Sequence, residues 1–238
     1  MSISFRITRW HAASARLNTP EHWQAWAKGE LDAATLPESR PDLAFLPAIL
    51  RRRLSPAARL MFDAAHQVTE GVHCPTVLVS HDGELNRSFD LWQTLLKEHS
   101  VSPTSFGLSV HNALVGQWSM LQGDTSEHTA LAARESGWEL AFLEAAAMLE
   151  EGCGRVLVLA VDYPLANDIP AACRRAPFPY AVAALIEAGN GWTLERRTPA
   201  GQNGDYWGAL QWAKQMWAGQ TDFCNPYTDH AWQWHTTP

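Results

Sequence analysis

The chain has little positive charge and no long hydrophobic segment. Its 238 residues include 18 lysines and arginines against 25 aspartates and glutamates, a formal net charge of −7. This acidic excess argues against a nucleic-acid-binding protein, which needs a basic surface to contact phosphates. No apolar segment approaches the roughly 20 residues of a membrane-spanning helix, and the N-terminus lacks the charged and then apolar layout of a secretory signal. We therefore expect a cytoplasmic protein without a membrane span.

Cysteines are also few. Cys74, Cys153, Cys173 and Cys224 form no C-x-x-C pair and have no metal-ligand spacing with histidine. The sequence thus predicts reduced, structural thiols, with no metal site and no cofactor. What the chain does have is 46% hydrophobic residues, enough for a sizeable core in a protein whose length fits one domain.

The hydrophobic pattern predicts strands that alternate with helices, as in an α/β fold. Strands are expected at 3–10, 75–80, 129–133 and 156–161, and the segments 180–187 and 192–195 are expected to form a hairpin across Gly189-Asn190-Gly191. Helices are expected at 20–28, from Ser55-Pro56 to residue 68, through 91–96 and at 206–217, with an irregular connection at 36–47.

One segment predicts a parallel crossover in more detail. Ser136-Gly137-Trp138-Glu139 is typical of a capping box, so we expect a helix to begin at Ser136 and to end at Gly152. The uninterrupted apolar run at 156–161 predicts a strand covered on both faces. Glu135 then lies at the helix entrance, where the helix dipole stabilises a carboxylate by about 0.3–1 kcal/mol. In the simplest interpretation Glu135 is only part of this cap.

Several segments, in order, resemble the N-terminal half of β-ketoacyl synthases. They are S-P-T-S-F-G-L-S-V-H-N-A at 102–113 followed by Gly116, and the segments 51–65, 77–87 and 156–164. The chain is most similar to the short chain-length-factor-like proteins of aryl polyene and related type II polyketide or fatty-acid pathways. This resemblance covers most of residues 1–190. It implies a thiolase-like α/β half with a mixed sheet and helices on both faces, truncated relative to full ketosynthases.

The same resemblance implies a catalytically inactive protein. The position of the family's nucleophilic cysteine falls on Glu135, or on Arg134 with a shift of one residue, and neither side chain attacks a thioester as a thiolate does. The two histidines that assist condensation in the family come from a C-terminal half, and none of the ten histidines here lies in a matching motif. The implied function is a chain-length-factor subunit that heterodimerises with a full-length β-ketoacyl synthase and shapes its acyl tunnel.

Carried over by position, the resemblance also assigns residues to the tunnel and to the dimer interface. The tunnel-lining residues are Ser105, Phe106, Ser109 and Val110, although core packing is an equal interpretation for Phe106. The interface strand consists of Thr129, Ala130, Leu131, Ala132 and Ala133. Arg51-Arg52-Arg53 is a dense basic cluster that would attract an acidic acyl carrier protein, unless it is only a solvated face.

The C-terminal part has a different composition. Residues 1–197 are expected to form the ketosynthase-like domain, and 198–238 a tail that packs on this domain or on a partner. The tail holds five tryptophans, which are Trp207, Trp212, Trp217, Trp232 and Trp234. Tryptophan is enriched where proteins bury surface against each other, so both placements stay open.

Two other functions remain as alternatives. A serine hydrolase or acyltransferase is suggested by Gly107-Leu108-Ser109-Val110-His111, but histidine replaces the second glycine of G-x-S-x-G. Ser80-His81-Asp82 contains the residue types of a catalytic triad, yet sequence neighbours are not expected to converge in the required geometry. The other alternative is a carrier-protein-binding adaptor that needs no ketosynthase.

Overall fold

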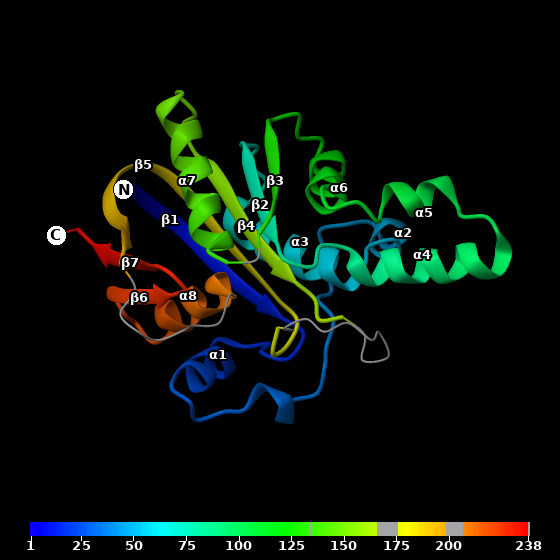
Figure 1. Cartoon of the computed structure of the whole chain (residues 1–238), viewed down its shortest axis with the longest axis horizontal. Coiled ribbons are helices and arrows are strands. Elements are labelled where there is room, and N and C mark those ends of the chain that lie inside the picture. Colours follow the sequence, from blue (N-terminus) through cyan, green and yellow to red (C-terminus); the bar gives the residue numbers. More distant parts are fainter. Residues whose placement is uncertain (134, 166–175, 199–206, 238) are drawn as a thin grey trace.

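A single mixed β-sheet runs through the protein. The structure is a computed structural model, and it describes residues 1–133, 135–165, 176–198 and 207–237. Its strands are β1 (Ser2–Ser14), β2 (Thr76–Ser80), β3 (His128–Ala132), β4 (Val156–Asp162), β5 (Tyr180–Arg197), β6 (Asp222–Pro226) and β7 (Ala231–Thr236). They follow the order β3-β2-β4-β5-β7-β6, and β1 pairs with β5 (Figure 1). β2 pairs with β3 and β4 in parallel, which confirms the predicted crossover.

Helices cover both faces of the sheet. They are α1 (Pro20–Ala27), the 3-10 helix η1 (Ala33–Thr35), α2 (Ala48–Arg51), α3 (Pro56–Thr69), α4 (Leu85–Glu98), α5 (Pro103–Gly107), α6 (Ala113–Gln122), α7 (Gly137–Glu150) and α8 (Gly208–Trp217). Strand β4 shows why its sequence is apolar throughout. Val156 and Val158 pack into the core beneath α7 and α8, whereas Leu157 and Leu159 pack into the core beneath α3. The fold is therefore the expected α/β layering with two cores.

The start of α3 follows its local sequence. The Ser55 hydroxyl accepts a hydrogen bond of 3.0 Å from the Ala58 amide, and Pro56 occupies the first turn, where no amide donor is needed. The apolar face of α3 is buried and includes Leu60, Met61 and Val68. The predicted helix start is confirmed.

The predicted hairpin is wrong. Residues 180–197 form one long strand, β5, and both halves of it pair with β1. Glu187 lies opposite Arg6 while Trp192 lies opposite Phe5, so residues 188–191 bulge out of the ladder instead of turning the chain back. Gly189 has a φ of 153°, and a Cβ there would lie 3.3 Å from the Arg6 Cβ. The glycines thus allow a bulge. β1, with 13 residues, is long enough to pair with β5 on both sides of it.

The described part of the tail completes the sheet. β7 pairs with the second half of β5, and β6 pairs with β7. Trp212, Trp232 and Trp234 are buried in the core, and Trp217 stacks on Trp23 with ring centroids 6.3 Å apart. Residues 207–237 therefore pack on the same domain. A boundary at residue 198 and a contact of the tail with a partner stay predictions.

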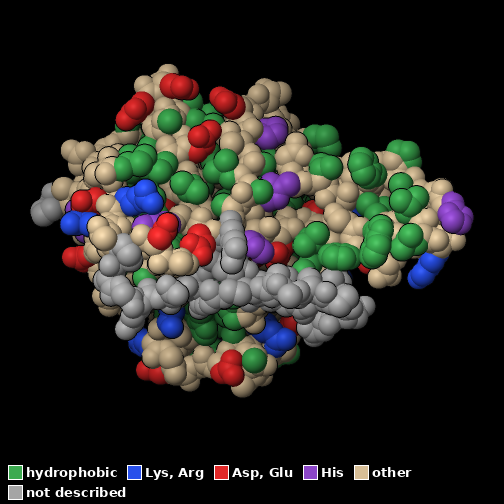
Figure 2. Space-filling model, viewed as in Figure 1, with side chains coloured by type: hydrophobic (Ala, Val, Ile, Leu, Met, Phe, Trp, Pro, Cys, Tyr) green, Lys and Arg blue, Asp and Glu red, His purple; other side chains and the backbone are tan. Residues whose placement is uncertain are grey.

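Helices α4 and α5 extend away from the sheet as an arm (Figure 1). Neither helix contains a buried residue. Hydrophobic side chains gather on this arm (Figure 2), and the exposed ones on it and at its end are Leu85, Trp92, Leu95, Leu96, Phe106 and Val110. Among the described residues, no helix is long and apolar enough to cross a membrane.

Candidate functional site

The connection between β3 and α7 is a sharp corner. β3 ends at Ala132, α7 begins at Gly137, and Ser136 between them has φ 57° and ψ 18°, in the left-handed region. A Cβ on Gly137 would lie 2.8 Å from a Val79 methyl group, so glycine allows the helix to start close against β2. Residues other than glycine rarely adopt the left-handed backbone conformation, and those that do often mark functional sites.

The predicted capping box is wrong, although the helix does begin at this point. Ser136 makes no side-chain hydrogen bond to the helix, because its left-handed backbone directs the hydroxyl elsewhere. Glu139 does not reach back to the cap but lies fully buried. Its carboxyl group accepts hydrogen bonds from Asn225 (2.7 Å) and Tyr227 (2.8 Å). Burial raises the pKa of Glu139, and these hydrogen bonds oppose the rise.

The Ser136 hydroxyl contacts the tail instead. Its Oγ lies 2.5 Å from His230 Nε2, and His230 Nδ1 lies 2.5 Å from Asp229 Oδ1. The indole nitrogen of Trp232 donates a 3.1 Å hydrogen bond to the same Oγ. No local pattern in the sequence reveals this cluster, because Ser136 and His230 are 94 positions apart.

Glu135 lies at the same corner and is half-buried. Its Oε1 accepts a 2.9 Å hydrogen bond from the Thr228 hydroxyl, so the tail also satisfies this carboxylate. Arg134, the other candidate for the nucleophile position, lies outside the described residues. The role of Glu135 as a degenerate nucleophile position stays a prediction.

A cavity of about 290 Å³ opens at this corner. Its polar wall includes Glu135, Ser136 and His230, and its apolar wall includes Leu140, Leu143 and Trp232. Leu140 is exposed, so the cavity reaches the molecular surface. The pocket is therefore bordered by a hydroxyl, an imidazole and a carboxylate, and Ser136 itself is buried, with 4% of its surface exposed.

The predicted interface strand is an edge of the sheet. β3 has β2 on one side and, among the described strands, none on the other. The Glu127 carbonyl accepts a hydrogen bond from the Thr76 amide, and the Ala133 amide donates one to the Ser80 carbonyl. The backbone groups of Glu127 and Ala133 thus face β2. Since backbone groups alternate sides along a strand, Ala130 and its even-numbered neighbours direct their N–H and C=O groups to the open edge.

The predicted tunnel residues lie on the arm and directly after it. Phe106 is 60% exposed and Val110 is also exposed, whereas Ser105 and Ser109 are half-buried. Core packing within this chain is therefore ruled out for Phe106. Ser109 donates to the Phe106 carbonyl at 2.8 Å, and His111 Nε2 lies 2.9 Å from the Leu131 carbonyl oxygen. Since Ser109 follows a short helix and not a strand, the G-x-S-x-G reading gains no support.

The second serine motif does not converge as a triad, as the sequence predicts. His81 and Asp82 do meet, with Nδ1 and Oδ1 2.6 Å apart. The Ser80 hydroxyl, however, donates to the buried carboxylate of Asp162 at 3.1 Å and accepts from the Gly83 amide at 2.7 Å. Its proton is directed to a structural carboxylate, which leaves Ser80 unsuited to attack a substrate.

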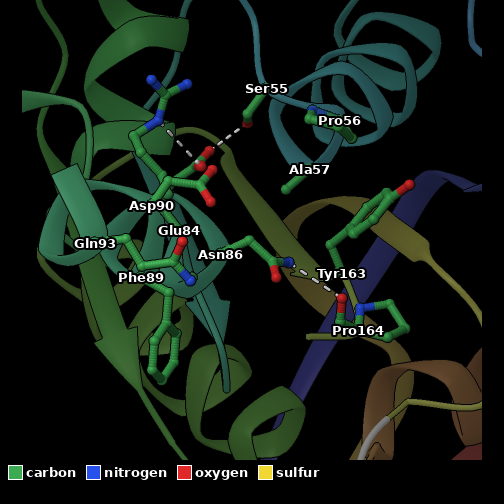
Figure 3. A pocket seen from close by; sticks show the side chains of 12 residues that line it. Ser55, Pro56, Ala57, Glu84, Asn86, Phe89, Asp90, Gln93, Tyr163 and Pro164 are labelled. Atoms are coloured by element: carbon green, nitrogen blue, oxygen red, sulfur yellow. Dashed lines mark hydrogen bonds and ion pairs between the residues drawn. The ribbon is translucent and has the colours of Figure 1, made fainter. Parts of the chain in front are cut away.

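A larger cavity of about 450 Å³ lies where the arm joins the body (Figure 3). Buried Glu84 accepts a hydrogen bond from the Ser55 hydroxyl and pairs with Arg87 at 3.5 Å. Burial raises the pKa of Glu84. Asn86 donates to the Pro164 carbonyl at 3.1 Å. These contacts tie the start of α4 to α3 and to the segment after β4, and so fix the direction of the arm.

The basic cluster forms part of a shallow hollow of about 380 Å³. Arg40, Arg51, Arg52 and Arg59 line it together with Asp42, which pairs with Arg51 at 2.6 Å. Partial burial, together with the like charges of Arg40 and Arg51, lowers the pKa of Arg59. Arg52 is exposed. The hollow is therefore electropositive although the whole chain is acidic.

The three cysteines that the structure describes form no disulfide. Cys74, Cys153 and Cys224 are free, and Cys173 lies outside the described residues. Burial and the nearby Asp124 carboxylate raise the pKa of Cys74 to about 11, so it stays protonated at neutral pH. No group of three potential metal ligands occurs in the described part of the chain.

The mixed sheet, its helical layers and the buried strand-helix-strand crossover define a thiolase-like ketosynthase fold. A model of the N-terminal domain of β-ketoacyl synthases matches residues 23–235, and the chain belongs to this family. No curated protein matches the sequence significantly.

Solved structures show the same fold. A chain of the ketosynthase (ApeO) in complex with its chain length factor (ApeC) from Xenorhabdus doucetiae has a TM-score of 0.86 at 24% identity, over 98% of this chain and 99% of that chain. The ishigamide ketosynthase/chain length factor has a TM-score of 0.65 at 17% identity, over 91% of this chain and 74% of that chain. A β-ketoacyl synthase from Burkholderia phymatum STM815 has a TM-score of 0.59 at 10% identity, over 92% of this chain and 71% of that chain.

Proposed function

We propose that this chain is the non-catalytic chain-length-factor subunit of a heterodimer with a full-length β-ketoacyl synthase, in the cytoplasm. The pathway would be an aryl polyene, polyketide or fatty-acid-like one, as the sequence resemblance implies. The observation that carries the proposal is an exposed apolar arm next to an unpaired sheet edge, in a chain of the ketosynthase family. The two most similar structures cited above are both described as ketosynthases with chain length factors.

The arm needs a partner on energetic grounds. Trp92 is 56% exposed, Leu96 59% and Phe106 60%. Full burial of a large apolar side chain stabilises by about 1.5–3 kcal/mol, so covering several such side chains favours association by several kcal/mol. Contiguous exposed apolar surface of this kind marks interaction sites on soluble proteins. We infer that the ketosynthase covers the arm.

The edge strand supplies the complementary backbone contact. Unpaired N–H and C=O groups along β3 form a template for a strand from another chain. Thr129, Ala130 and Leu131 are only partly exposed and the exposed Ala132 is small, so a second strand can approach this part of β3 closely. A continuous sheet across the heterodimer would place the arm against the partner, with Phe106 and Val110 at the partner's acyl tunnel.

The nucleophile position supports a role without condensation. A carboxylate at Glu135 accepts a hydrogen bond from Thr228 and is a poor nucleophile toward thioesters. In this proposal the ketosynthase carries out the condensation, and the bulk of Phe106 limits the length of the product.

Co-expression with a cognate ketosynthase tests the proposal. We expect a stable heterodimer that buries well over about 2,000 Å², as obligate pairs do, and no condensation by this chain alone. Size-exclusion chromatography, pull-down and a malonyl condensation assay give the readouts. A stable monomer that ignores ketosynthase, or a purified chain that condenses malonyl units unaided, contradicts the proposal.

A carrier-protein contact is a second proposal, supported by the arginine hollow. Acyl carrier proteins are acidic, and Arg40, Arg51, Arg52 and Arg59 gather positive charge on one surface. Replacing exposed Arg52 by glutamate should weaken carrier-protein binding and reduce its dependence on salt. A titration with carrier protein, with and without ketosynthase, separates a pure adaptor from a subunit of the heterodimer.

A further inference from the structure

The corner between β3 and α7 holds a serine, a histidine and an aspartate in the order of an acyl-transfer triad. From the Ser136, His230 and Asp229 contacts we propose that Ser136 is an acyl-accepting nucleophile, with His230 as its general base and Asp229 orienting the imidazole. The substrates are short, uncharged acyl esters and thioesters. This inference goes beyond the chain-length-factor role, in which non-catalytic means that the chain does not carry out the condensation, and it does not depend on a ketosynthase.

The protonation pattern of the histidine follows from its neighbours. Asp229 Oδ1, 2.5 Å from Nδ1, is an acceptor, so it favours the tautomer with the proton on Nδ1. Hydrogen bonding to His230 holds the pKa of Asp229 below its usual range, which keeps this carboxylate ionised. Nε2 then carries a free electron pair 2.5 Å from Ser136 Oγ, within reach for proton transfer.

The surroundings of Ser136 favour the developing alkoxide. The Trp232 indole already donates to Oγ at 3.1 Å. Ser136 also directly precedes α7, a helix of 14 residues whose N-terminus carries partial positive charge. Ser136 has a left-handed backbone and lies on a sharp turn between a strand and a helix, as the nucleophile of α/β-hydrolases does, although the glycines of their motif are absent here.

The cavity indicates the substrate class. Leu140, Leu143 and Trp232 form an apolar wall beside the hydroxyl, and Glu135 and Arg196 line the cavity with opposite charges. About 290 Å³ accommodates an acyl chain of only a few carbons. The exposed Leu140 lies at the opening, where a leaving thiol or alcohol would extend into solvent.

The chemical step balances without an oxidant or a metal. Ser136 Oγ attacks the acyl carbonyl carbon and His230 Nε2 takes the hydroxyl proton. Collapse of the tetrahedral intermediate breaks the C–S or C–O bond, and the leaving thiolate or alkoxide takes that proton from His230. The products are an acyl-serine ester and a thiol or alcohol. Water, deprotonated by the same histidine, then releases the acid and restores the serine.

Asp229 differs from the buried aspartates of efficient triads. Its side chain is 78% exposed, whereas that of His230 is only 14% exposed. Water competes for this carboxylate, so its orienting effect is smaller than in a buried triad. We expect slow turnover, with the acyl-serine ester readily trapped.

The test uses the full chain with a fluorophosphonate and with S-butanoyl-N-acetylcysteamine. Intact mass and peptide mapping should place one phosphonyl or butanoyl group on Ser136. His230→Gln should slow labelling about 100-fold, Asp229→Asn should slow it about tenfold, and Ser136→Ala should abolish it. Ser100→Ala, which alters an exposed serine, should label at the wild-type rate. Thermal melting of each variant verifies its fold.

Because the adduct is mapped on the unaltered chain, the result does not depend on how any variant folds. No adduct on Ser136, labelling of another residue, or an unchanged rate in His230→Gln would overturn the proposal. Ketosynthase co-purification separates the two hypotheses. A chain that binds ketosynthase without acylation refutes only the triad, and a chain that is acylated without binding refutes only the subunit role.

Discussion

The hydroxyl of Tyr227 donates a 2.8 Å hydrogen bond to the carboxyl group of Glu139, joining the tail to the middle of the domain. Glu139 is fully buried on α7, whereas Tyr227 lies between β6 and β7. Asn225 and Trp234 donate to the same carboxyl group from these two strands. One glutamate therefore joins β6, β7 and the turn between them to the helix that follows the corner.

This carboxyl group should make stability depend on pH. Burial raises the pKa of Glu139 above its ordinary value of 4.5, so folding favours the protonated form. Its contribution to stability is complete below about pH 4.5 and is lost as pH rises through the raised pKa. Glu139→Gln stays neutral, so its free energy of unfolding relative to wild type should increase between about pH 5 and pH 8.

Urea denaturation of both proteins across this range measures the difference. Glu150→Gln, at an exposed position on the same helix, is the matched control and should follow wild type. Parallel stability curves for wild type and Glu139→Gln would show that Glu139 does not titrate in this range.

The glycine beneath this network should not tolerate a side chain. A Cβ on Gly208 would lie 2.0 Å from the Tyr227 hydroxyl oxygen and 3.1 Å from a Glu139 oxygen. Tyr227 would have to move away and leave a buried carboxyl group with one partner fewer. We expect Gly208→Ala to lower the free energy of unfolding by about 1–3 kcal/mol. Gly154→Ala, with open space around its Cβ, should change it by less than about 0.5 kcal/mol. Equal stability of the two variants in denaturant titrations would refute the close packing.

The sequence predicts the structure correctly where neighbours along the chain decide it. The apolar run of β4 and the Ser55-Pro56 start of α3 each carry their own signal, and both are confirmed. The hairpin failed because glycines permit a bulge as well as a turn, and the long pairing with β1 decided between them. The capping box failed for a similar reason: Ser136 and Glu139 bond to the tail, whose approach no local pattern reveals.

The open edge of β3 predicts a variant that separates folding from assembly. The Ala130 amide faces away from β2, so Ala130→Pro removes a donor from the edge and leaves the β2–β3 ladder in place. The isolated chain should stay folded, whereas binding to ketosynthase should weaken at least about tenfold because a ladder hydrogen bond is lost and the proline ring blocks approach. Ala130→Ser keeps the amide and is the control. Affinity measured by calorimetry that is equal for both variants would contradict pairing through this edge.

The bulk of Phe106 should set product length if the arm enters the partner's tunnel. Phe106 is 60% exposed, so Phe106→Ala and Phe106→Trp should leave the stability of the isolated chain within about 0.5 kcal/mol of wild type. In a heterodimer reconstituted with carrier protein, alanine should shift the products toward longer chains and tryptophan toward shorter ones, while condensation continues at the ketosynthase. Met120→Ala, at an exposed hydrophobic residue on α6 outside the arm, should leave the distribution unchanged. Mass spectrometry of the carrier-bound products measures the shift, and an identical distribution across the series would exclude Phe106 from the tunnel even if the heterodimer forms.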